Sequence, residues 1–254
     1  MPQNFSESWP IAMPHSLPGQ GEVIVWRLSF SRSPEELAQA EAVLTDEERA
    51  RADRFLRVAD RAAFVLQRGT LRLVLRRLLG VPAARIRFTV GERGKPAVAE
   101  VPGAPEFNVS GSGEWGLLAL AASFAVGVDL EAHRPLDYLE LGQKVFAAEE
   151  LAQLSALPES ARPAGFFAGW SRKEAFVKAL GLGLYFPLDQ FAVSLRPDEP
   201  ARVLSVRGNR ALGQEWSLVD LPVAPGYSAA VAAQAPILKV RRCEVPDLRT
   251  LALD

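Results

Sequence analysis

The feature that most restricts the fold is an apolar run from Trp115 to Val128, entered through "FNVSGSGE" and left through "DLE". Its 14 residues are too few to cross a bilayer, and no longer charge-free apolar run occurs in the 254-residue chain. Continuous apolarity over a short length is typical of strands buried on both faces. We therefore predict two adjacent buried strands, 115–122 and 125–131, joined by a short turn near Ser123.

The remaining patterns predict an α+β fold with two similar halves. Strands are expected at 22–30, 85–90, 191–195, 202–206, 216–221 and 227–233, and helices from Pro34, from Asp46, and over 60–79, 136–145, 149–157 and 166–180. "GYSAAVAA" at 226–233 resembles "EWGLLALAA" at 114–122 in pattern, which suggests repetition. We assign 1–21 to a flexible N-terminal arm, 22–126 to an N-terminal half and 127–254 to a C-terminal half.

Charge is unevenly distributed along the chain. Residues 49–95 hold twelve Arg and one Lys against three acids, a balance of +10, whereas the whole chain has a net charge of −1. An anionic ligand or partner would explain this segment, and a solvated arginine-rich helix surface would explain it equally well. Nucleic-acid binding is disfavoured, because the phenylalanines of this segment follow an apolar rhythm that indicates a core.

The chain shows no sign of export. Residues 1–22 lack the basic and apolar regions of a secretory signal, and the single Cys243 excludes an internal disulfide. We expect a cytoplasmic protein that does not bind membranes.

Two sets of charged residues are candidates for chemistry. Asp129 and Glu131 would project from the same face of a strand, and Glu174 and Lys178 would share one face of a helix. Either set alone is more often an ordinary surface feature, namely two solvated acids and an i,i+4 salt bridge. Together they would suit a hard divalent cation bound to a phosphate ester, because Mg²⁺ prefers oxygen ligands and lysines neutralise phosphate oxygens. The chain has no phosphate-binding GxxxxGK[ST] loop, no GxGxxG after a predicted strand and no CxxC pair, and only two histidines are available for zinc or triad chemistry.

"GVDLE" at 127–131 and "WSRKEAFVKALGLGL" at 170–184, about forty residues apart, resemble the two signature motifs of the 4′-phosphopantetheinyl transferases. "RGKP" at 93–96, "FNVS" at 107–110 and the arginine-rich helix extend the similarity to the long, single-chain, Sfp-type members.

The resemblance implies an intramolecular pseudo-dimer of two α+β halves with the active site in the cleft between them. Such enzymes transfer 4′-phosphopantetheine from coenzyme A to a serine of an apo acyl, peptidyl or aryl carrier protein, release 3′,5′-ADP and depend on Mg²⁺. It also implies an acidic carrier protein as partner and a monomeric chain. The alternative is a catalytically silent protein of the same fold that binds coenzyme A or a carrier protein.

Residue roles follow from the resemblance by position. Asp129, Glu131 and Glu174 are the expected Mg²⁺ ligands, and Lys178 and Lys173 are expected against the coenzyme phosphates, with Lys178 also a candidate for proton transfer. Glu150 matches the acid near the incoming serine, although Glu149 beside it leaves the register open. The 3′-phosphoadenosine end is expected to contact Arg61, Arg68, Lys95, Ser110, Gly111 and Ser112.

One position departs from the family pattern. Members usually have His after Phe-Asn-x-Ser, whereas this chain has Gly111. Loss of a hydrogen bond to a charged phosphate costs about 1.5–3 kcal/mol unless other groups replace it. Gly111 would allow backbone N–H groups of 110–113 to form an anion-binding nest, or the enzyme would prefer a donor such as dephospho-coenzyme A.

Overall fold

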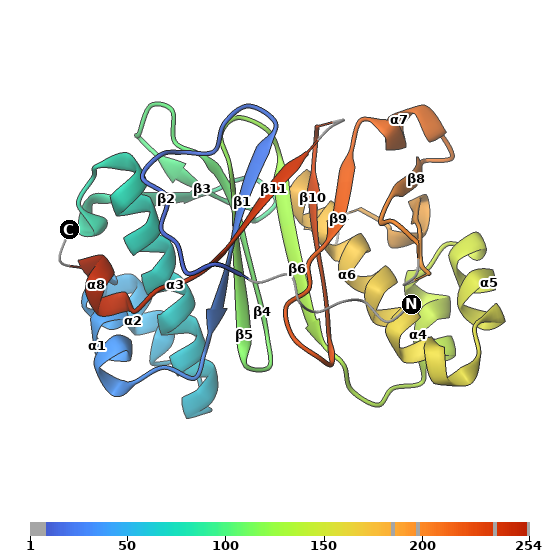
Figure 1. Cartoon of the computed structure of the whole chain (residues 1–254), viewed down its shortest axis with the longest axis horizontal. Coiled ribbons are helices and arrows are strands. Elements are labelled where there is room, and N and C mark those ends of the chain that lie inside the picture. Colours follow the sequence, from blue (N-terminus) through green and yellow to red (C-terminus); the bar gives the residue numbers. More distant parts are fainter. Residues whose placement is uncertain (1–8, 184–185, 197–198, 236–237, 253–254) are drawn as a thin grey trace. The chain divides into compact units, whose positions relative to one another are not determined.

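The computed structural model describes residues 9–183, 186–196, 199–235 and 238–252. The chain divides into two compact units, and each is described by itself (Figure 1). Among the described residues, the N-terminal unit comprises 9–89, 96–123 and 240–252, and the C-terminal unit comprises 90–95 and the described parts of 124–239. Within the described residues, every helix is too short or too polar to cross a membrane.

The N-terminal unit is a four-stranded sheet with helices packed against it. Its strand order is β11-β1-β5-β4, and β2 and β3 form a separate hairpin. In chain order its elements are β1 (Glu22–Ser29), α1 (Pro34–Ala42), α2 (Asp46–Ala52), α3 (Val58–Leu79), the 3₁₀ turn η1 (Ala83–Arg85), β2 (Arg87–Val90), β3 (Pro96–Ala99), β4 (Glu106–Ser112), β5 (Trp115–Ala121), β11 (Lys239–Glu244) and α8 (Leu248–Ala252).

The C-terminal unit contains a three-stranded sheet of order β6-β10-β9 and a second sheet of β7 and β8. In chain order its elements are β6 (Val126–Ala132), α4 (Tyr138–Val145), α5 (Ala148–Ala156), η2 (Glu159–Ala161), α6 (Arg162–Leu180), η4 (Leu188–Gln190), β7 (Phe191–Val193), β8 (Val203–Val206), α7 (Arg210–Gln214), β9 (Ser217–Asp220) and β10 (Tyr227–Ala233).

The two units repeat one order of elements. In each, a strand is followed by two short helices, a long helix, a short two-stranded sheet and two strands, the last of which pairs with the first. The central strands β5 and β10 each have seven residues. These observations confirm the α+β class and show the repetition suggested by the similar apolar patterns. The predicted cleft between the halves stays a prediction.

Local sequence explains where the helices begin and end. Ser33 and Thr45 cap α1 and α2, and in each case a Glu at the third helical position accepts a bond from the backbone N–H of the cap, which forms a capping box. Both long helices end on a left-handed glycine, Gly80 with φ 65° and Gly181 with φ 68°.

The structure corrects the predicted hairpin of 115–131. Strand β5 pairs with β1 and β4 in the N-terminal unit, whereas β6 pairs with β10 in the C-terminal unit. The apolar run is therefore two strands of two sheets, and the chain passes between units after Ser123.

Other boundaries also differ from the prediction. Residues 240–252 belong with the N-terminal half, where Cys243 and Leu248 join its core. Elements β3, β4, β11, α7 and α8 were not predicted. Of the predicted arm, residues 1–8 lie outside the described residues, while Trp9 is buried and Ile11 pairs with Glu244.

Candidate active site

Strand β6 places two carboxylates on one side of the C-terminal sheet. Asp129 lies opposite Ala230 of β10, and Glu131 lies opposite Ser228, two positions further along the same strand. Since side chains alternate between faces, both carboxylates project in one direction. Asp129 is only 3% exposed, so its charge is held largely away from water.

Gly127 allows α6 to approach this strand closely. A Cβ at this position would lie 2.1 Å from the carbonyl oxygen of Ala175 and 2.3 Å from the amide nitrogen of Ala179. Both distances are far inside van der Waals contact, so no larger residue fits without moving α6. The glycine of "GVDLE" therefore brings the helix within side-chain reach of the carboxylates.

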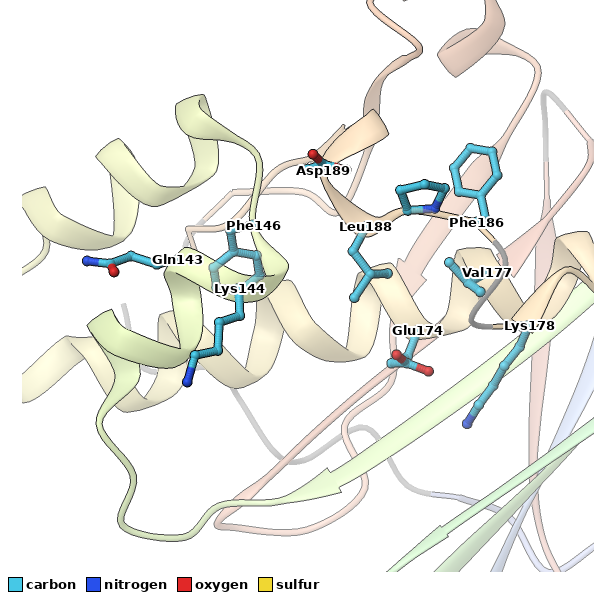
Figure 2. Close-up of a pocket in the computed structure, with 11 residues that line it drawn as sticks. Gln143, Lys144, Phe146, Glu174, Val177, Lys178, Phe186, Leu188 and Asp189 are labelled. Atoms are coloured by element: carbon cyan, nitrogen blue, oxygen red, sulfur yellow. The ribbon is translucent and has the colours of Figure 1, made fainter.

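Helix α6 contributes Glu174 and Lys178 to the same place, and Figure 2 shows both side chains extending from one side of the helix. The Nζ of Lys178 donates to Oδ1 of Asp129 at 2.5 Å. Burial raises the pKa of Glu174, and the charges of Asp129 and Glu131 raise it further while Lys178 opposes them. The structure thus places Glu174 and Lys178 on the side of β6 that carries Asp129 and Glu131, whereas Lys173 lies apart from them.

Two residues that were not predicted as part of the site, Trp170 and Arg134, orient Glu131. Trp170 Nε1 donates to its Oε1 at 3.0 Å, and Arg134 contacts its Oε2 at 3.2 Å. Trp170 stands four residues before Glu174 in the second motif, and that spacing places it on the same face of α6. The spacing was therefore a signal that could have identified it.

The donor set suits a hard divalent cation, since it consists of three carboxylates and no sulfur or imidazole. Among the described residues, no three Asp, Glu, His or Cys side chains lie close enough together to hold a metal ion. Lys178 contacts one of the two carboxylate oxygens of Asp129, Oδ1.

Glu150 and Lys173 form a buried ion pair. Lys173 Nζ donates to Glu150 Oε2 at 2.5 Å, and the two side chains are 1% and 0% exposed. Glu150 also accepts backbone N–H groups from Ala147 at 2.7 Å and Val193 at 2.8 Å, and these three donors indicate a charged carboxylate. Burial raises the pKa of Glu150 and lowers that of Lys173, and their mutual attraction opposes both shifts. Neighbouring Glu149 is exposed.

The predicted phosphate contacts of the N-terminal unit are engaged with carboxylates. Arg61 pairs with Glu41 at 2.5 Å and with Asp53 at 3.1 Å. Arg68 lies 3.4 Å from Glu48. Their roles toward coenzyme A stay predictions.

Residues 110–112, where an anion-binding nest was one of the expectations, form the end of strand β4. Ser110, Gly111 and Ser112 lie opposite Leu117, Gly116 and Trp115 in a regular ladder, so the predicted nest of backbone N–H groups is wrong. A Cβ at Gly111 would lie 3.1 Å from the ring of Phe30, so this glycine is explained by close packing.

Lys95 lies in the C-terminal unit near the end of α6. Its Nζ donates to the carbonyl oxygen of Ala179 at 3.2 Å, and its side chain packs beside Gly181. Lys95 and Lys178 therefore both reach the last turns of the helix that bears Glu174.

A pocket of about 590 Å³ adjoins Glu174 and Lys178 (Figure 2). Apolar side chains form much of its wall, and the polar groups lie around them. Its lining includes Phe146, Val177, Phe186, Leu188, Lys144 and Asp189.

Comparison with known proteins shows the family of the chain. The model of the 4′-phosphopantetheinyl transferase superfamily matches residues 125–232, and that of the 4′-phosphopantetheinyl transferase N-terminal region matches 29–123. The 4′-phosphopantetheinyl transferase HetI of Nostoc sp. is 34% identical over 83% of this chain and 87% of its own length. Sfp of Bacillus subtilis is 31% identical over 80% and 88%, respectively.

Among solved structures, holo-[acyl-carrier-protein] synthase of Thermotoga maritima covers 44% of this chain and 64% of its own, with 18% identity and a TM-score of 0.36. That likeness is too low to add to the argument. On the sequence matches, the chain belongs to the 4′-phosphopantetheinyl transferase superfamily.

Proposed function

We propose that this enzyme transfers 4′-phosphopantetheine from coenzyme A to a serine hydroxyl of an apo carrier protein and releases 3′,5′-ADP. The observation that carries the proposal is the convergence of Asp129, Glu131, Glu174 and Lys178, at the positions of the family's two motifs, on one side of the C-terminal unit. The serine oxygen forms a bond to the β-phosphorus, the bond from that phosphorus to the bridging oxygen breaks, and the serine proton passes to solvent.

Asp129, Glu131 and Glu174 would hold Mg²⁺ once Lys178 leaves Asp129. When bound, the ion supplies positive charge to the diphosphate oxygens and orients them for in-line attack. The chain's own contribution is to present the three carboxylates on one side of the C-terminal unit. Burial raises the pKa of Glu174, and the charges of Asp129 and Glu131 raise it further.

Lys178 and Lys95 are the proposed contacts to the coenzyme phosphates. Both ammonium groups lie near the end of α6, and Lys178 would exchange Asp129 for a diphosphate oxygen. A cation there stabilises charge that builds on the departing 3′,5′-ADP. Glu150 and Lys173 are left out of this contact set because both are fully buried.

The pocket beside Glu174 and Lys178 is the proposed site of the pantetheine arm. This arm is uncharged, and the walls formed by Val177, Phe186 and Leu188 match its apolar parts. The Arg-rich segment 49–95 would favour an acidic carrier protein.

The test is an intact-mass assay with apo acyl, peptidyl and aryl carrier proteins, coenzyme A, and either Mg²⁺ or EDTA. We expect at least one carrier protein to gain one phosphopantetheine group in Mg²⁺ and none in EDTA. No gain with any carrier at saturating coenzyme A would overturn the proposal. Calorimetric binding of coenzyme A without mass gain would identify the silent binding protein instead.

A further inference from the structure

The Glu150–Lys173 pair has a counterpart in the N-terminal unit, at the same place in the repeat. Glu48 is the third residue of α2, and Glu150 is the third residue of α5, the second short helix of each unit. Each carboxylate accepts the backbone N–H of its own helix cap, from Thr45 at 3.0 Å and from Ala147 at 2.7 Å.

The cations correspond as well. Arg72 stands eight residues before Gly80, and Lys173 stands eight residues before Gly181, the left-handed glycines that end α3 and α6. Arg72 contacts Glu48 through Nε at 2.7 Å and NH2 at 3.0 Å, which matches the 2.5 Å contact of Lys173 with Glu150.

Each cation also binds the carbonyl that follows a 3₁₀ turn. Arg72 donates to the oxygen of Ile86, directly after η1, at 3.1 Å, and Lys173 donates to that of Phe191, directly after η4, at 2.7 Å. Both pairs thus tie the second short helix, the long helix and the start of the small sheet together. The Arg72 and Lys173 side chains are 2% and 1% exposed.

The N-terminal copy lies in a unit that lacks the carboxylate cluster. The same alignment of the long helices puts Leu73 where the C-terminal unit has Glu174. Because the ion pair also occurs in the unit without the carboxylate cluster, its role is to support the fold. The Glu150 side chain is 0% exposed, so it cannot contact a carrier serine.

We infer that Glu150 and Lys173 are positioning residues that fix α6 against α5 and β7 and so orient Glu174, and that neither touches the carrier serine or a coenzyme phosphate. This differs from the roles that the family resemblance implied for both. The activity part of the inference rests on the proposed function, whereas the stability part does not.

A double-mutant cycle separates the two roles. Glu150→Gln or Lys173→Met alone leaves a buried group without its charged partner, and we expect each to lower the urea midpoint and the transfer rate. The double variant Glu150→Gln/Lys173→Met removes both charges. We expect its urea midpoint to return to the wild-type value or above, its kcat to recover to within roughly tenfold, and the KM for coenzyme A and the shape of the kcat–pH profile to stay unchanged.

Two further sets act as controls. Glu48→Gln, Arg72→Met and their double variant should reproduce the pattern of urea midpoints in the other unit. Lys173→Arg copies the N-terminal pair and should retain kcat within roughly tenfold, as the conservative variant of a positioning residue.

Three results would overturn the inference. A double variant that folds as stably as wild type yet stays roughly 10²–10⁴-fold slow, or loses one limb of the pH profile, would make Glu150 a catalytic acid or base. A raised KM for coenzyme A in that variant would make Lys173 a phosphate contact. Urea midpoints that fall additively, with no recovery in the double variant, would refute the pairing itself. If wild type labels no carrier protein, the proposed function fails, and the urea midpoints still decide the stability part.

Discussion

The N-terminal and C-terminal units build one arrangement of elements from different side chains. When β5 and β10 are aligned end to end, their fourth residues pair with Trp26 in one unit and with Asp129 in the other. Their second residues pair with Leu28 and Glu131. Trp26 and Leu28 are buried in the N-terminal core, where an apolar face is covered by α3.

This difference shows how little of the fold is committed to chemistry. An ion pair at the same place in the repeat occurs in each unit, Glu48–Arg72 in the N-terminal unit and Glu150–Lys173 in the C-terminal unit. The carboxylates Asp129 and Glu131, in contrast, replace apolar residues in the C-terminal unit only. Close helix packing also differs. In the C-terminal unit a glycine on the strand, Gly127, meets α6, whereas in the N-terminal unit a glycine on the long helix, Gly69, meets Ala40 of α1.

The largest expected effect is the loss of transfer in Glu174→Gln. Removing one charge from the proposed cation site should lower kcat on the order of 10²–10³-fold. The variant should also be more stable than wild type at neutral pH. Because the pKa of Glu174 is raised in the folded protein, its carboxyl stabilises the fold below its unfolded pKa, and this contribution is lost as pH rises through its folded pKa. Glutamine does not ionise and therefore avoids the cost of a buried charge at pH 7. Urea unfolding at pH 7 and initial transfer rates measure the two effects, and Glu140→Gln on the exposed face of α4 is the control. Unchanged transfer would remove Glu174 from the site.

The next effect tests the two glycine contacts. Gly127→Ala and Gly69→Ala should each destabilise the fold, by about 1–3 kcal/mol or more, because the added methyl meets backbone atoms. Under conditions where both variants remain folded, only Gly127→Ala should slow transfer, since only Gly127 sets the distance between α6 and Asp129. Equal transfer rates in the two variants would contradict this role for Gly127.

A smaller effect tests whether each of the two ion pairs stabilises only the unit that contains it. Cys243 is the only cysteine, it is buried in the N-terminal core, and burial raises the pKa of its thiol, so native labelling should be slow. Glu48→Gln should accelerate labelling by roughly tenfold, the effect of about 1.4 kcal/mol, by opening that unit. Glu150→Gln should leave the rate near that of wild type. Equal acceleration by both variants would show that the units open together.

The smallest effect concerns Lys178. Because its ammonium holds Asp129, Lys178→Gln should bind Mn²⁺, a substitute for Mg²⁺, about fivefold more tightly, as expected for a part-buried pair worth about 1 kcal/mol. Electron paramagnetic resonance of free Mn²⁺ measures this without turnover. Weaker binding than in wild type would mean that Lys178 does not compete with the cation.

Local patterns predicted most of the elements and the site in the C-terminal unit. The capping boxes, the closing glycines and the spacings of Asp129 with Glu131 and of Glu174 with Lys178 are all set by residues a few positions apart. Such signals are independent of the rest of the chain. They were therefore visible in the sequence.

The errors came from contacts between distant residues. Strands β5 and β6 are neighbours in sequence, but β5 pairs with β1, which contains Val23, and β6 pairs with β10, which ends at Ala233. No local pattern in the sequence identifies these distant partners. Arg72 belongs to the arginine-rich helix, whose arginines would be expected on an exposed face, yet its side chain is buried. Its partner Glu48 is 24 residues away in sequence, so no local pattern shows the contact that permits this burial. Glu150 is similar, since its burial depends on Lys173 and Val193.

The most direct measurement compares Asp129→Asn with Trp26→Phe, the matching positions of the two units, by intact mass of a carrier protein incubated with coenzyme A and Mg²⁺. Trp26→Phe removes no hydrogen bond among the described residues but leaves a cavity in the core, so both variants are assayed under conditions where they remain folded. We expect Trp26→Phe to label the carrier protein at close to the wild-type rate and Asp129→Asn to be slower on the order of 10²-fold or more. Equal labelling rates in the two variants would contradict the claim that the chemistry lies in the carboxylates of the C-terminal unit.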